Sequence, residues 1–343
     1  MSTSETAPWV TYRPQIKVLD CTIRDGGLIN DHQFDDDLVR AVYETCVEAG
    51  VDYMEIGYKA SKKVFARDKH GDWKFCDEDA IRRIVGDNKT PLKLSVMADA
   101  GGKCDWHTDI LPKDQSVLDM IRVACYINQI PEAVDMIKDA HDKGYETTCN
   151  VMAISTVKDG EIDQALDVLA QTPASTIVVV DSNGALYTEQ IEILVKKYKK
   201  ALEGTGKEVG IHAHNNQELA FANTIEAIIH GANRVDATMA GLGRGAGNCR
   251  MELLLGFLRN PKFNLRPVWK LLQERFIKLR QEMDWGALPP YVISGQLNQH
   301  PRTAMAWMDG PNKERCLDFY DRCISEADTA VILTAIQPAE RVA

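Results

Sequence analysis

Residues 208–240 read EVGIHAHNNQELAFANTIEAIIHGANRVDATMA, and this stretch predicts one strand–helix–strand unit. A short run with β-branched residues (208–214) precedes an amphipathic segment that ends at Gly231, and a second strand pattern follows at 234–240. A glycine directly after an amphipathic segment is typical of a helix C-terminus. Two strands joined through one helix form the repeating unit of parallel α/β proteins.

The same pattern repeats outward along the chain. Strands are expected at residues 16–22, 51–58, 91–98, 120–127, 146–154, 176–182, 208–214 and 234–240. Eight strand–helix units favour a closed (β/α)8 TIM barrel over an open doubly wound sheet. The weakest unit is the third, because residues 101–115 follow its strand without a helical pattern and are expected to form a loop.

The repeats also predict how the chain is divided. Its 343 residues allow either two ordinary domains or one barrel with an added segment. The eight units favour the second arrangement, with a polar N-terminal tail at 1–15, a barrel at 16–260 and a helical C-terminal extension at 261–343. Within the extension, residues 267–285 and 314–328 have helical patterns with no strand between them.

Composition narrows the class of ligand and the compartment. The net charge of −10 (40 basic against 50 acidic residues) disfavours nucleic acids and anionic membranes, which require a concentrated basic face. Nine cysteines is an odd number, and several lie among apolar residues, as expected for free thiols in a reducing cytosol. The first residues lack the pattern of a signal peptide, and no apolar run approaches the roughly 18 residues of a membrane span. We therefore expect a cytoplasmic protein, not attached to a membrane, with a small-molecule ligand.

Catalytic residues of a TIM barrel lie where its strands end, and two polar groups stand at such positions. His212 and His214 point to the same side of one strand, because side chains two residues apart share a face. Arg24 and Asp25 follow the first strand. Asp25 with the two histidines would form a 2-His-1-carboxylate set suited to a divalent metal ion. The alternatives are two hydrogen-bonded loop histidines and a surface salt bridge.

Residues 241–248, GLGRGAGN, follow the last strand and open the next helix. A glycine-rich turn at a helix N-terminus can bind phosphate through backbone N–H groups. No strand with a ribose-binding acid follows, so a dinucleotide site is weakly supported. The turn can instead bring the backbone close to a metal, with Asn248 as an amide ligand or as a helix cap.

Three motifs occur in order: Thr22-x-Arg24-Asp25-Gly26, His212-x-His214 and Gly-x-Gly-x-x-Ala-Gly-Asn ending at Asn248. Together they resemble the DRE-TIM metallolyase (HMG-CoA-lyase-like) superfamily over roughly residues 16–260, and most of all its 4-hydroxy-2-oxovalerate aldolase type. The resemblance implies a (β/α)8 barrel with a divalent metal ion, Mn²⁺ foremost and Mg²⁺, Co²⁺ or Zn²⁺ as alternatives. The metal would lie on Asp25, His212 and His214 near Asn248, with Arg24 as electrostatic catalyst.

The chain also departs from these relatives. Gly27-Leu28 stand where acetyl-CoA-using relatives have Glu-Gln, and residues 241–248 lack the cysteine of HMG-CoA lyases. Leu28 occupies the position of the catalytic-base histidine of the aldolases, so aldol cleavage needs another proton acceptor. The candidates near the predicted site are His32, Glu55, Tyr58, Asp181 and Tyr291. We expect Glu55 and Tyr291 to be catalytic and Asp181 to bind substrate together with Arg24.

The leading hypothesis is a metal-dependent carbon–carbon lyase, an aldolase, that cleaves a 2-oxo acid through a pyruvate-type enolate. The metal would chelate the carboxylate and 2-oxo oxygens, and Arg24 would help to stabilise the enolate. The alternatives are an enzyme that condenses an acyl group or aldehyde with a 2-oxo acid, and a non-catalytic relative that binds metal and oxo acid. A Schiff-base aldolase using Lys59 or Lys93 is less favoured, because it would leave the metal set without a purpose. A homodimer is expected, whereas the C-terminal extension gives no support for a dehydrogenase partner.

Overall fold

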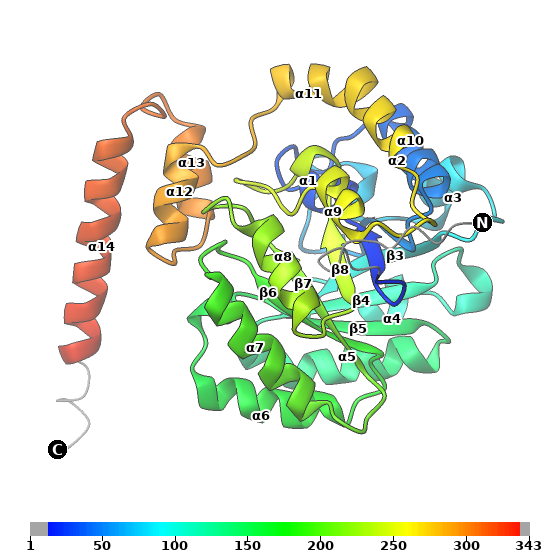
Figure 1. Ribbon diagram of the computed structural model, residues 1–343, viewed down its shortest axis with the longest axis horizontal. Helices are drawn as coiled ribbons and strands as arrows, with labels where there is room; N and C mark the ends of the chain where they lie inside the picture. Colours follow the sequence, from blue (N-terminus) through cyan, green and yellow to red (C-terminus); the bar gives the residue numbers. More distant parts are fainter. Residues whose placement is uncertain (1–12, 337–343) are drawn as a thin grey trace, which may run out of the picture.

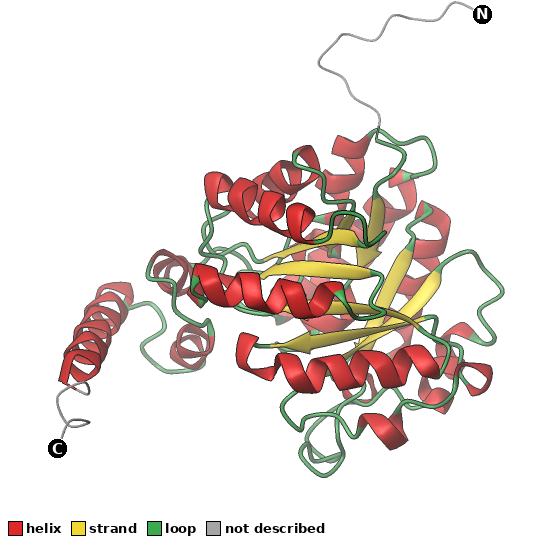
Figure 2. Cartoon of the chain, turned by 90° about the horizontal axis from the view of Figure 1, so that it is seen from below, coloured by secondary structure: helices red, strands yellow, loops and turns green. Residues whose placement is uncertain are grey.

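Eight parallel strands form a closed barrel in chain order. Figure 2 shows the strands in yellow with helices around them. The computed structural model describes residues 13–336, so residues 1–12 of the expected N-terminal tail lie outside the described part. The strands are β1 (Lys17–Asp20), β2 (Tyr53–Tyr58), β3 (Lys93–Asp99), β4 (Met120–Cys125), β5 (Glu146–Val151), β6 (Thr176–Asp181), β7 (Glu208–Ala213) and β8 (Arg234–Ala237). Pairing of β1 with β8 closes the barrel, with Lys17 opposite Arg234. The predicted (β/α)8 fold is confirmed.

The strands are apolar because both of their faces are covered. All six residues of β6, TIVVVD, are buried, and the same holds for β2 and β4. Helices cover the outer face and side chains fill the interior, so such strands need no alternation of polar and apolar residues. A charged side chain inside these strands therefore requires a partner.

Helices surround the barrel: α2 (Asp36–Ala49), α3 (Glu78–Val85), α5 (Ile130–Asp142), α6 (Asp159–Ala170), α7 (Thr188–Ala201) and α8 (Ala220–Ile229). Helix α2 begins where Asp35 accepts a hydrogen bond from the backbone N–H of Leu38, and it ends at Gly50 in the left-handed conformation. After β3 the structure has only the short helix α4 (Trp106–Asp109) and a 3-10 turn (Lys113–Gln115), as expected from the weak pattern of the third unit.

The segment after β8 is helical, as predicted (Figure 1). It contains α9 (Met251–Leu258), α10 (Leu265–Leu271), a π-helical turn (Leu272–Phe276), α11 (Ile277–Glu282), α12 (Pro289–Gln296), α13 (Arg302–Met308) and α14 (Cys316–Ile336). Helix α10 packs against α2, whereas α12 packs against α13 and α14 at one side of the barrel. No helix in the described part is long and apolar enough to cross a membrane.

Charged side chains cover the N-terminal ends of the strands, away from the site described below. Glu208 bonds to Arg234 and, at 2.9 Å, to Lys17. Arg234 also contacts Glu146 at 2.5 Å, and Lys93 contacts the same carboxylate at 3.3 Å. Groups on this face of a TIM barrel typically serve stability rather than catalysis.

Candidate metal centre

A single helical turn, α1 (Thr22–Gly26), follows β1 and carries Arg24 and Asp25. The Thr22 hydroxyl donates to Asp20 at 2.6 Å and accepts from the backbone N–H of Met239 at 2.8 Å, which ties the turn to the loop after β8. Both Arg24 and Asp25 are buried at the C-terminal mouth of the barrel. The sequence pattern predicted that Arg24 and Asp25 follow the first strand, but it did not predict that they lie in a helical turn.

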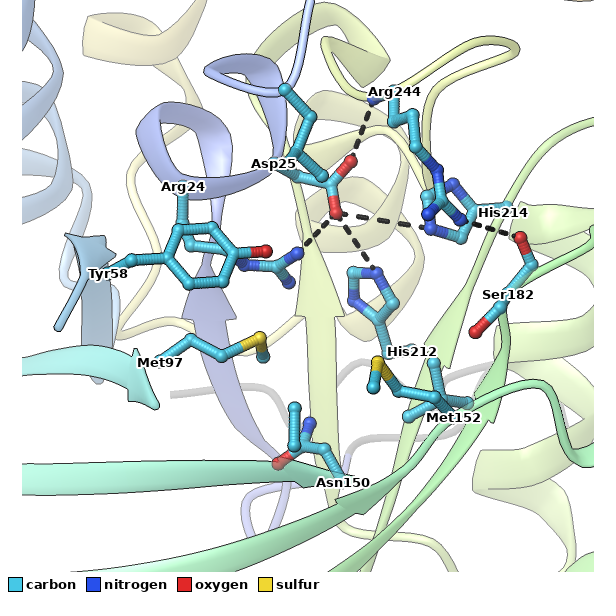
Figure 3. A pocket seen from close by; sticks show the side chains of 13 residues that line it. Arg24, Asp25, Tyr58, Met97, Asn150, Met152, Ser182, His212, His214 and Arg244 are labelled. Atoms are coloured by element: carbon cyan, nitrogen blue, oxygen red, sulfur yellow. Dashed lines mark hydrogen bonds and ion pairs between the residues drawn. The ribbon is translucent and has the colours of Figure 1, made fainter. Parts of the chain in front are cut away.

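Asp25, His212 and His214 converge on one point (Figure 3). Oδ2 of Asp25 lies 3.4 Å from Nε2 of His212 and 3.9 Å from Nε2 of His214. One ligand atom from each residue lies within 4.8 Å of the others. Buried polar atoms are normally hydrogen-bonded, yet His212 Nε2 and His214 Nδ1 have no such partner. These donors fit a divalent metal ion with ligand positions left open.

His212 is oriented from behind by Asp236. Its Nδ1 lies 2.9 Å from Oδ2 of Asp236, which leaves Nε2 facing Asp25. The same Asp236 oxygen accepts from Arg122 at 2.6 Å. A carboxylate on the far nitrogen fixes the ring and raises its basicity, as is usual for histidines that bind metals.

Cys21, His212 and Asp236 form another group of potential ligands with similar spacing. In that group, Asp236 is already bonded to both Arg122 and His212. Burial raises the pKa of the Cys21 thiol well above its usual value, whereas metals bind the thiolate. Asp25 with the two histidines is therefore the better set.

Asn248 lies beside this set and has both side-chain polar atoms buried without a hydrogen-bond partner. Gly243 separates it from Asp25: a Cβ at Gly243 would lie 2.2 Å from Nδ2 of Asn248 and 2.8 Å from Oδ1 of Asp25. The glycine-rich loop thus approaches the centre through backbone alone. The amide of Asn248 is available as a further ligand.

The buried charges form a closed ring beneath the centre. Arg24 contacts Asp25 at 2.5 Å and Glu55 at 2.6 Å. Arg122 contacts the same Glu55 oxygen at 3.0 Å and continues to Asp236. Through His212 the ring returns to Asp25. Each charge has an opposite neighbour, which offsets the cost of removing the ring from water.

The electrostatics keep Asp25 and His214, but not His212, in the forms that bind metal. Burial alone would raise the pKa of Asp25, but Arg24 and the histidines hold it well below its usual value. Burial lowers the pKa of His214 well below its usual value. Burial acts the same way on His212, but Asp236 and Asp25 outweigh it and raise that pKa. Ionised carboxylates and neutral imidazoles are the ligating species.

The centre lies at the end of a cavity of about 380 Å³, its open mouth included. Its lining consists of Arg24, Asp25, Leu28, Tyr58, Met97, Ala124, Asn150, Met152, Val180, Ser182, His212, His214 and Arg244. A cavity of this size, mostly apolar with a few convergent polar groups, is typical of small-molecule sites. The structure thus brings together Arg24, Asp25 and the two histidines, with Asn248 next to them.

Three other expected site residues lie outside the cavity lining. Glu55 is fully buried behind Arg24, to which it is bonded. The Asp181 carboxylate accepts from the backbone N–H groups of Ala185 and Leu186, and burial raises its pKa to about 6. Tyr291, on α12, packs over Gly245. In the described structure, Glu55 and Asp181 bond to neighbouring groups, whereas the Tyr291 ring packs in an apolar cluster.

Sequence reasoning missed Arg122, Asp236 and Arg244. Arg122 and Asp236 stand inside strand patterns that are otherwise apolar, MIRVAC and RVDA. A charge within a strand buried on both faces is costly unless paired, and this signal could have identified both residues. Arg244 occupies a variable position of the glycine-rich motif, so the motif alone did not mark it.

A family model described as HMGL-like matches residues 15–266. The chain belongs to the HMGL-like family. The match covers the barrel from before β1 to the start of α10. The predicted membership of the DRE-TIM metallolyase superfamily is confirmed.

Proteins similar in sequence to this chain carry the names of lyases. The chain is 30% identical over 250 residues to the oxaloacetate decarboxylase of Mycobacterium tuberculosis, covering 73% of this chain and 71% of that protein. It is 29% identical over 271 residues to the 4-hydroxy-2-oxovalerate aldolase of Thermus thermophilus, covering 76% and 74% respectively.

Solved structures agree with this fold. The N-terminal domain of a protein from Bacteroides vulgatus, described as a putative aldolase, matches with a TM-score of 0.73 and 28% identity, over 87% of this chain and 98% of that one. The hydroxymethylglutaryl-CoA lyase of Pseudomonas aeruginosa matches with a TM-score of 0.64 and 14% identity, over 81% of this chain and 96% of that one. At 14% identity, the match to the lyase of Pseudomonas aeruginosa shows a shared fold alone.

Proposed function

We propose that this protein is a divalent-metal-dependent carbon–carbon lyase that acts on a 2-oxo acid. The observation that carries the proposal is the buried set of Asp25, His212 and His214 with unpartnered imidazole nitrogens, in a small cavity beside Arg24. The names of the family relatives support the same class of reaction. When bound to this set, a divalent cation would act as a Lewis acid on the 2-oxo group.

Arg24 supplies the fixed positive charge for the reaction. Burial opposes its charged form, but Glu55 and Asp25 outweigh burial and raise its pKa well above the usual value. When the bond between C3 and C4 of the 2-oxo acid breaks, C4 leaves as the aldehyde or carbon dioxide, and the electron pair passes through C3 into an enolate whose oxygen gains negative charge. A preorganised guanidinium stabilises such charge without having to reorganise. Glu55 acts as a positioning residue, because it holds Arg24 through Nε rather than lining the cavity.

The cavity lining favours a decarboxylation as a second candidate reaction. Aldol cleavage requires a base to take the substrate hydroxyl proton. Among the described residues of the lining, Leu28 is apolar and Arg24 and Arg244 are cationic, while Asp25 and the histidines belong to the metal set. Burial raises the pKa of Tyr58, so this phenol is a poor proton acceptor. Loss of carbon dioxide from a 3-carboxy-2-oxo acid requires no such base.

Metal analysis tests the site itself. Purified protein loaded with Mn²⁺ and then desalted is expected to retain about one ion per chain, whereas Asp25→Ala and His212→Ala lose it. His141→Ala, on the exposed surface of α5, is the matched control and should retain the ion. Full metal occupancy in both site variants, measured by elemental analysis, would overturn the proposal.

Two assays test the chemistry. Metal-dependent deuterium exchange at the methyl group of pyruvate would reveal enolate formation. Incubation with oxaloacetate and with 4-hydroxy-2-oxo acids then separates carbon dioxide release from aldehyde release. A metal-loaded protein that neither exchanges pyruvate nor cleaves any of these compounds would contradict a lyase function.

Three finer points belong to the same proposal. We propose Mn²⁺ as the native metal, a homodimer as the assembly and the cytoplasm as the location. Metal content of the protein purified from its natural source, light scattering after size exclusion and cell fractionation test these points in turn.

A further inference from the structure

Arg244 is the second guanidinium that lines the cavity, and it comes from the glycine-rich loop after β8. Its backbone N–H donates to Oδ1 of Asp25 at 2.8 Å, which fixes the start of the side chain at the metal set. Its Nη2 donates to the backbone carbonyl of Ser182 at 2.8 Å. Figure 3 shows the side chain on the His214 side of the cavity, apart from Arg24.

The two cavity arginines differ in their partners. Arg24 is held by two carboxylates, those of Asp25 and Glu55. Arg244 contacts a neutral carbonyl, its Nε is buried without a hydrogen-bond partner, and no carboxylate of the described residues lies within 4.0 Å of its guanidinium. Arg244 is only partly buried, and its guanidinium has no carboxylate partner, so an anion that enters the cavity gains a strong partner here.

Other cations lie near the same mouth. Burial, together with positive charge from Arg244, Arg302 and Lys103, lowers the pKa of His300 to about 3. Lys74 stacks on the ring of Tyr58, its ammonium 4.5 Å from the ring centre, and Tyr58 lines the cavity. Cationic side chains therefore lie around this mouth although the whole chain carries a net charge of −10, and one of them, Lys103, has Asp99 at 3.9 Å.

We propose that Arg244 is a specificity-determining residue that binds a second carboxylate, so that the preferred substrates are 2-oxo acids with a carboxylate at both ends. This inference rests on the proposed lyase function and specifies its substrate class. The 2-oxo acid end of the substrate would bind to the metal set and Arg24. The second carboxylate would bind to the N–H groups of Arg244 that Ser182 does not occupy, since a guanidinium binds a carboxylate through two parallel hydrogen bonds.

Matched ligands test the proposal. Pairs of 2-oxo acids with four, five and six carbons are titrated calorimetrically into the Mn²⁺-loaded full chain. Within each pair, one acid ends in a carboxylate and the other in a methyl group; 2-oxoglutarate and 2-oxopentanoate are the five-carbon pair. Binding of oxaloacetate is followed by rapid mixing so that turnover does not interfere. At least one dicarboxylic acid should bind roughly ten- to a hundredfold more tightly than its partner, as expected for a hydrogen-bonded charge pair.

The variants identify the residue responsible. Arg244→Gln should reduce the preference within that pair to less than about threefold, and Arg244→Lys should give an intermediate value because it keeps charge without the fork. Arg266→Gln, exposed on α10, is the control and should keep the full preference. The measured quantity is the ratio of the two affinities within a pair, because a general loss of folding would weaken the binding of both ligands to the same extent.

The outcomes separate this inference from the proposed function. Equal binding within every pair by a wild-type protein that exchanges pyruvate would overturn the inference alone. An unchanged preference in Arg244→Gln would assign the second carboxylate to another residue and would also overturn it. Absence of metal binding and of pyruvate exchange in the wild type would instead contradict the lyase function.

Discussion

Asp236 accepts a hydrogen bond from Nδ1 of His212 at 2.9 Å, and this contact turns Nε2 of the ring toward Asp25. The contact links a charge inside β8 to a ligand at the end of β7. Arg122 on β4 bonds to the same carboxylate from across the barrel. The metal set is therefore supported by side chains within the barrel interior as well as by loops at its mouth.

Removing the charge of Asp236 should weaken metal binding. In Asp236→Asn the shape is kept, but the imidazole loses the negative partner that raises its basicity. We expect Mn²⁺ affinity to fall about 10- to 100-fold, measured by competition with a fluorescent chelator. Asp163→Asn, on the exposed face of α6, should bind as the wild type does. Equal affinities in the two variants would exclude this role for Asp236.

A methyl group at Gly243 should disturb the centre without changing any charge. The new Cβ would lie 2.2 Å from Asn248 Nδ2 and 2.8 Å from Asp25 Oδ1, so at least one of them must move. We expect Gly243→Ala to lose more than about tenfold in metal affinity, since displaced ligands bind poorly.

The matched control is Gly160→Ala on α6, where a Cβ would meet no atom within 4 Å. It should leave metal affinity and melting temperature unchanged. Normal metal binding by Gly243→Ala would show that the glycine-rich loop can move without weakening metal binding. The close contact of Gly243 with Asn248 and Asp25 would then not be required for the site.

Loss of the Glu55 charge should destabilise the fold more than an ordinary polar substitution does. Glu55 accepts from Arg24 and Arg122, and all three side chains are buried. Glu55→Gln leaves two cations in the barrel facing each other without the anion between them. We expect about 3 kcal/mol less free energy of unfolding, in the range found for broken buried ion pairs.

Urea denaturation measures this difference, with Glu203→Gln on the exposed surface as the control. A loss below about 1 kcal/mol would mean that solvent or a protein rearrangement compensates for the missing anion.

Acid should reduce the stability that the ion pairs at the N-terminal ends of the strands contribute. Burial would raise the pKa of Glu208, but Arg234 and Lys17 lower it below its usual value. A lowered folded-state pKa means that the contribution of Glu208 is complete above its unfolded pKa of about 4.3 and is lost as the pH falls through the folded value. We expect Glu208→Gln to be less stable than the wild type at pH 7 and to lose less stability below pH 4.5.

Thermal unfolding between pH 3 and pH 7 checks this sign. Glu203→Gln again serves as the control and should follow the wild-type profile. If Glu208→Gln and the wild type have parallel profiles, the ion pairs on this face do not contribute to acid sensitivity.

The sequence by itself determined the barrel and the candidate metal ligands. Apolar strand patterns separated by amphipathic segments define eight units, because an element buried on both faces must be apolar throughout. His212 and His214 could be paired because the two-residue repeat of a strand places them on one face. Asp25 could be joined to them because all parallel strands of a barrel end at the same mouth.

The tertiary structure alone decided which polar groups surround those ligands. Arg122, Glu55 and Asp236 lie far apart in sequence, and only closure of the barrel brings them into one ring. The expected roles of Asp181 and Tyr291 depended on where their side chains point, and the structure turns both away from the cavity lining. Arg24 has carboxylate partners and Arg244 has none, and this difference depends on distances of a few ångströms across the fold. Such distances are set by packing between distant segments, and no local pattern in the sequence encodes them.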